Sequence, residues 1–80
     1  MHELGVLCQV VSTVGRVAKE KKIKKVKHIT LEVGEESGYV PQFLEKLFPV
    51  ATDYYKEIGK PELKLVIVPG KGLQIKDFGY

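Results

Sequence analysis

The chain has 80 residues, enough for one domain but too few to enclose a large catalytic cavity. Hydrophobic residues make up 44% and charged residues 29%, which is typical of a globular protein and argues against a disordered one. The net charge of +3 is mild, and a single cysteine, Cys8, cannot form an internal disulfide. A reducing compartment therefore fits the composition best.

No apolar stretch reaches the roughly twenty residues that a membrane-spanning helix needs, because Arg16 and Lys19 end the first one. A secretory signal would place basic residues before its apolar core, whereas here Glu3 comes first and the lysines follow. We expect a cytoplasmic chain that makes no contact with membranes.

The first predicted element is an amphipathic helix from Leu4 to Ala18, because apolar residues recur at spacings of three and four. After a lysine-rich exit, apolar and polar residues alternate from Val26 to Val33, which predicts a strand with one buried face. On this strand we expect His28 to lie at the surface, sharing a polar face with Thr30 and Glu32.

A second helix is predicted from Pro41 to Ile58, because proline suits the first helical turn. Pro49 lies inside it and should bend or split the helix near Glu45, because proline removes a backbone hydrogen bond. The predicted buried face consists of Leu44, Leu47, Phe48, Ala51, Tyr55 and Ile58.

The last third of the chain predicts two strands joined by a turn. Residues 62–68 become apolar on both faces, which favours a central or nearly central strand. The turn at residues 69–72 is followed by Leu73, Ile75 and Phe78, which predict a short third strand. The expected fold is α+β, in the order α-β-α-β-β, with two helices packed on one face of a small mixed three-stranded sheet.

Few side chains in this sequence could carry catalysis. There are two histidines, one cysteine and no serine in a nucleophile-elbow setting, so we expect no enzymatic activity. The amino terminus is more suggestive, because His2 can combine its ring nitrogen with the terminal amine and backbone nitrogens around one metal ion. Such a nearly planar nitrogen set suits divalent nickel or copper, and Glu3 could add an oxygen or orient the imidazole.

The start Met1-His2-Glu3-Leu4, followed directly by an amphipathic helix, and the stretch from Lys24 to Pro41 together resemble the HypA/HybF family of nickel-insertion accessory proteins. The likeness continues through Phe43-Leu44-Glu45 to the strand that ends at Val68-Pro69-Gly70-Lys71. The resemblance implies that residues 1–80 form a single nickel-binding domain.

The resemblance also implies a metal site in which the terminal amine of Met1 and the ring and backbone nitrogens of His2 bind one Ni(II), with Glu3 contributing its backbone nitrogen or tuning the site. It implies delivery of nickel to a maturing nickel-iron hydrogenase, or to urease, together with the GTPase HypB. Members of this family carry a zinc-binding module with two Cys-x-x-Cys pairs after the Pro-Gly-Lys turn, whereas Gly72 to Tyr80 contains no cysteine. We therefore expect no zinc in this chain, and Leu73 to Phe78 should replace the strand that follows the zinc module.

Two other functions remain as alternatives. The cluster Lys19–Lys27 could make a weak nucleic-acid binder through phosphate contacts, although no aromatic residues are interleaved and no recognition motif is present. The chain could instead be a protein-interaction module without metal delivery. In that case the edge from Leu73 to Phe78 would form a homodimer, with Phe78 and Tyr80 exposed at the contact.

Overall fold

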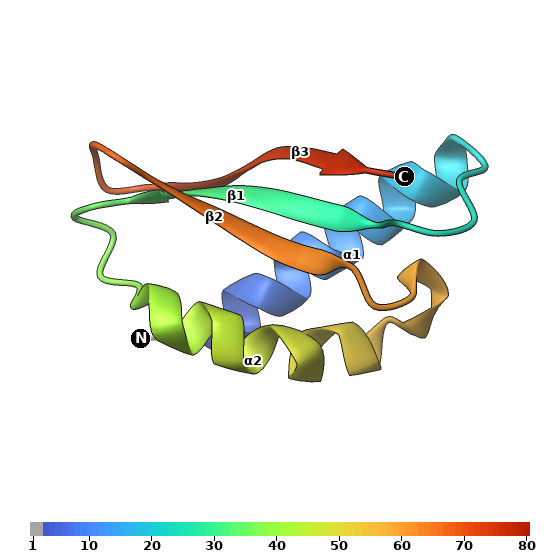
Figure 1. The fold of residues 1–80 in the computed structure, drawn as a ribbon, viewed down its shortest axis with the longest axis horizontal. Coiled ribbons are helices and arrows are strands. Elements are labelled where there is room, and N and C mark those ends of the chain that lie inside the picture. The colour runs from blue at the N-terminus through green and yellow to red at the C-terminus, as the bar shows by residue number, and fades with distance from the viewer. Residues whose placement is uncertain (1–2) are drawn as a thin grey trace.

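The computed structural model describes residues 3–80. The elements are helix α1 (Glu3–Glu20), strand β1 (His28–Gly34), helix α2 (Pro41–Tyr54), the short 3-10 helix η1 (Lys56–Ile58), and strands β2 (Glu62–Val68) and β3 (Leu73–Gly79). The predicted α+β fold and the order α-β-α-β-β are confirmed. Figure 1 shows both helices on the same side of the sheet, which leaves its other face without a covering helix.

The sheet is mixed, with the strand order β2-β1-β3. β1 pairs in parallel with β2, from His28 opposite Glu62 to Gly34 opposite Val68. A parallel pair needs a long crossover, and α2 provides it between β1 and β2. β1 pairs antiparallel with β3, with an irregularity between Thr30 and Leu31.

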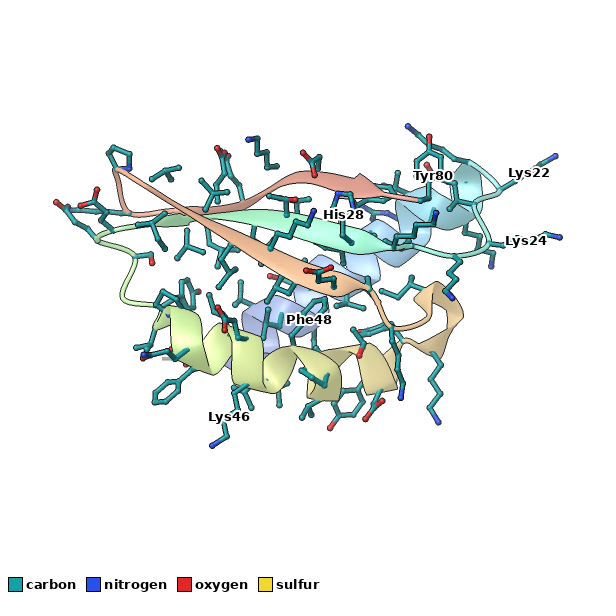
Figure 2. All side chains as sticks on the ribbon, viewed as in Figure 1. Lys22, Lys24, His28, Lys46, Phe48 and Tyr80 are labelled. Atoms are coloured by element: carbon teal, nitrogen blue, oxygen red, sulfur yellow. The ribbon has the colours of Figure 1, made fainter. Side chains whose placement is uncertain are left out.

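The hydrophobic core lies between the two helices and the sheet. Leu7, Val11 and Val14 of α1 are almost fully buried, and their spacing matches the predicted helical stripe. The central strand contributes Ile29, Leu31 and Val33, and α2 contributes Leu44, Phe48 and Ala51. Figure 2 shows Phe48 pointing from α2 toward the sheet.

The prediction that residues 62–68 form a central or nearly central strand is wrong, because β2 lies at an edge of the sheet and β1 lies at its centre. Two apolar residues of β2 are exposed. Val66, on the face opposite to Leu63 and Leu65, retains 37% of its accessible surface. Ile67, on the same face as Leu63 and Leu65, retains 52%. Apolar residues on both faces of a strand favour a central position, but β2 has a neighbouring strand on one side only.

Two further expectations about the strands need correction. Thr30 is buried, because the strands on either side place Lys64 and Asp77 next to it. Phe78 is only partly exposed and packs against the core, whereas Tyr80 is exposed as expected.

Helix α2 runs through Pro49 to Tyr54 as one element, so the expected split near Glu45 does not occur. The proline can remove only the hydrogen bond from its own nitrogen to the carbonyl of Glu45. Both residues are exposed, so water can hydrogen-bond to that carbonyl. The hydroxyl of Thr52 donates to the carbonyl of Pro49 at 2.9 Å, within the same turn.

The connection between β2 and β3 crosses the end of β1, because the two strands lie on opposite sides of it. Three backbone amides hydrogen-bond across this short crossing. The amide of Gly34 donates to the carbonyl of Gly72. The amide of Glu35 donates to the carbonyl of Val68, and that of Glu36 to the carbonyl of Gly70, at 2.8 Å each. A Cβ atom on Gly34 would lie 2.4 Å from the carbonyl oxygen of Gly70, so the crossing requires glycine there.

Candidate metal site at the amino terminus

Glu3 is the first residue of α1 and is buried, with only 7% of its surface exposed. Burial of a carboxylate is costly unless it accepts hydrogen bonds. Its Oε2 atom lies 3.4 Å from the backbone nitrogen of Val40, which donates to it. The start of α1 is thus attached to a residue 37 positions further along the chain.

Val40 is the N-cap residue of α2 and has an extended backbone conformation. No side chain of its own caps this helix, and the first turn of α2 has no acidic residue. The carboxylate of Glu3 accepts from the N-cap amide, as the glutamate of a capping box would do from within the helix. Its negative charge also lies near the positive end of the α2 dipole.

The backbone amide of Glu3 belongs to the first turn of α1. The first four N–H groups of an α-helix have no intrahelical acceptor, so this nitrogen takes no part in the hydrogen-bond ladder of α1. It is therefore compatible with the predicted role as a backbone ligand. Met1 and His2, the other two predicted ligands, lie outside the described residues.

Among the side chains that the structure describes, three or more of His, Cys, Asp or Glu never gather closely enough to hold a metal ion. His28 is half-buried on β1, and its Nε2 atom lies 3.6 Å from Oδ1 of Asp77 on β3. Cys8 is half-buried in α1. The side chains of His28 and Cys8 thus lie on different elements, with no described group of ligands around them.

The six lysines of the Lys19–Lys27 cluster are all exposed at the end of α1 and along the segment that leads to β1. Figure 2 shows Lys22 and Lys24 extending from this end of the molecule into open space. This is the solvated arrangement that cations adopt near the carbonyl end of a helix. It gives the nucleic-acid alternative no added support.

Sequence reasoning missed the contact between Glu3 and Val40, because no spacing rule relates residues so far apart. The only signal was indirect: α2 begins without a capping side chain or an acidic residue, so its first amides need an acceptor from elsewhere.

The fold and the amino-terminal geometry define a small α+β domain in which the first residue of one helix is held against the start of the other. The family model described as "Hydrogenase/urease nickel incorporation, metallochaperone, hypA" matches residues 1–76. The chain therefore belongs to the HypA family of nickel-incorporation metallochaperones.

Curated relatives agree with this assignment. The chain is 38% identical over 72 residues to the "Hydrogenase maturation factor HypA" of Trichodesmium erythraeum, covering 90% of this chain and 60% of the relative. It is 40% identical over 53 residues to the protein of the same name from Methanosarcina barkeri, covering 66% of this chain and 40% of that one. The chain thus spans between 40% and 60% of the length of these relatives.

Among the described residues, no helix combines the length and the apolar character needed to cross a bilayer.

Proposed function

We propose that this chain captures one Ni(II) ion at its amino terminus and passes it to the precursor of a nickel enzyme. The observation that carries the proposal is the position of Glu3, which follows His2 directly and is fixed at the start of α1 by the amide of Val40. The choice of nickel as the metal rests on family membership, since the family model describes nickel incorporation.

In the proposed site, nitrogen atoms bind the ion: the terminal amine of Met1, the ring and backbone nitrogens of His2, and the backbone nitrogen of Glu3. A nearly planar nitrogen set is the environment that divalent nickel prefers. The carboxylate of Glu3 already accepts a hydrogen bond from Val40, so we assign it to anchoring the terminus rather than to the metal. The proposal places no zinc within residues 1–80.

Capture and release at this site need no catalysis. The ligands must lose protons to bind, so affinity should weaken as the pH falls. A site at the end of the chain also leaves space for ligands of an acceptor to replace the nitrogens one at a time. The acceptors in this proposal are the precursors of nickel-iron hydrogenase or urease, with the GTPase HypB as a further partner.

The test is a Ni(II) titration of tag-free chain that begins at Met1, followed by visible absorption. We expect a band with one-to-one stoichiometry that disappears in His2→Ala, because the imidazole nitrogen is lost. His28→Ala is the matched control, because it removes the other histidine of the chain. It should keep the band. Equal binding by both variants would show that the nickel is held elsewhere.

A further inference from the structure

Helix α2 carries a second apolar stripe in addition to its core-facing one. It consists of Phe43, Leu47, Val50 and Tyr54, at spacings of four, three and four, and we call it the outer stripe. Phe43 is 53% exposed, Val50 41% and Tyr54 68%, while Leu47 is half-buried. The spacing is that of the seam of a coiled coil, with Leu47 and Tyr54 at a positions and Phe43 and Val50 at d positions.

The core accounts for only one residue of this stripe, Leu47, which packs partly against it. At 100° per residue, the four side chains fall within an arc centred roughly 100° around α2 from the buried face of Leu44, Phe48 and Ala51. Exposed apolar residues scattered singly need no explanation, but a continuous row that spans the helix marks an interaction surface. Within the part of the chain that the structure describes, Phe43, Val50 and Tyr54 remain exposed.

The stripe is complementary to itself. If a second α2 packs antiparallel about a two-fold axis between Leu47 and Val50, each Leu47 faces Val50 of the second copy. In the next layers outward, each Phe43 faces Tyr54 of the second copy. A two-fold contact requires this reciprocity, in which residue i meets j and j meets i. The same register gives two aliphatic layers in the middle and an aromatic layer at each end.

The charges beside the stripe match the same register. Lys46 and Asp53 both occupy the g position and are both exposed. In an antiparallel pair, g positions of the two helices face each other, so Lys46 of each copy meets Asp53 of the other. Figure 2 shows Lys46 pointing away from the sheet on the outer side of α2. A parallel pair would lack these two opposite-charge contacts, because e and g positions face each other there and the e positions of α2 are the buried Leu44 and Ala51.

We propose that the outer stripe of α2 is the contact surface for a second copy of this chain, packed antiparallel. The surface offered is one helix of 14 residues, so the dimer should be weak and reversible. The starts of the two α2 helices would lie at opposite ends of the contact, about 20 Å apart by helix rise alone. Each copy would then keep its own amino terminus, so dimerisation does not require nickel.

The first test is sedimentation of the metal-free chain between about 10 µM and about 1 mM, the range expected for a contact of this size. The apparent mass should rise toward that of a dimer. The double substitution Phe43→Ser with Val50→Ser should leave a monomer across the range. The matched control is Val66→Ser with Ile67→Ser, which removes two equally exposed apolar residues of β2 and should not change the dimer.

The second test exchanges the charges and is independent of any loss of apolar surface. Lys46→Asp and Asp53→Lys should each weaken the dimer, by about tenfold, because each places like charges opposite one another twice. The double variant carrying both changes should regain the wild-type dissociation constant. Circular dichroism of all variants confirms that α2 remains folded.

Three results would overturn the proposal. The first is a chain that stays monomeric at the highest concentration. The second is a dimer that survives Phe43→Ser with Val50→Ser but is lost when Phe78 on β3 is replaced by serine, since that would place the contact on the sheet edge. The third is additivity: if the double variant weakens the dimer by the sum of the effects of Lys46→Asp and Asp53→Lys, then Lys46 of one copy does not contact Asp53 of the other.

Discussion

Glu3 links the two helices through one hydrogen bond and one favourable charge. Glu3→Ala removes the acceptor for Val40 and should lower the free energy of unfolding by about 1 kcal/mol, as loss of a helix cap does. Glu3→Gln keeps an acceptor oxygen and should recover part of this loss. Urea unfolding followed by circular dichroism measures both values, and an unchanged midpoint in Glu3→Ala would contradict the anchoring role.

The same residue allows the backbone ligand to be tested. Glu3→Pro and Glu3→Ala both lack the carboxylate, but only proline also lacks the backbone N–H. Because proline is tolerated at the first position of a helix, α1 should still form in both variants. Nickel titration should show binding retained in Glu3→Ala and lost in Glu3→Pro. Equal affinities would remove the Glu3 nitrogen from the ligand set.

Gly34 is the residue on which the crossing between β2 and β3 depends. In Gly34→Ala the added Cβ would lie 2.4 Å from the carbonyl oxygen of Gly70, so backbone atoms would have to move. We expect a loss of about 2–4 kcal/mol, the range of overpacking and disrupted backbone contacts. Gly72→Ala is the matched control, because a Cβ there meets nothing within 4 Å. Equal unfolding midpoints for the two variants would argue against the crossing.

At the scale of elements, α1 ends in a Schellman motif: the amide of Ile23 donates to Ala18 at 2.8 Å and that of Lys22 to Lys19 at 3.1 Å. Lys22 occupies the left-handed region at φ 59°, where glycine is normally found. Lys22→Gly should therefore raise the free energy of unfolding by about 0.5–1 kcal/mol. Thermal unfolding is compared with Lys21→Gly, a control at the preceding residue, which does not have a positive φ. Stabilisation by both variants or by neither would contradict the prediction.

The elements themselves were predictable, because their periodicities are local properties of the sequence. The stripe of Leu7, Val11 and Val14 and the alternation of Ile29, Leu31 and Val33 indicated α1 and β1 correctly. The position of β2 at an edge was not predictable in the same way. Val66 and Ile67 are as apolar as the residues of a buried strand, and only the pairing of β1 with both β2 and β3 shows that β2 lies at the edge of the sheet.

At the scale of the whole molecule, the two-layer arrangement followed from the order of elements, whereas the long-range contacts did not. The contact of Glu3 with Val40 and the approach of Gly34 to Gly70 each join segments more than thirty residues apart. Both lie at the end of the fold where α2 begins and β1 ends. The crossing at Gly34 allows a short direct connection between β2 and β3 across the end of β1.

The proposed nickel site depends on a terminal amine placed one residue before His2, so the most direct measurement moves that amine. Nickel affinity is measured by calorimetry for the chain that begins at Met1 and for one with a single glycine added before Met1. The extension keeps every side chain, but it should weaken binding by more than about tenfold, or about 1.4 kcal/mol. Equal affinities would contradict a site built on the terminal amine.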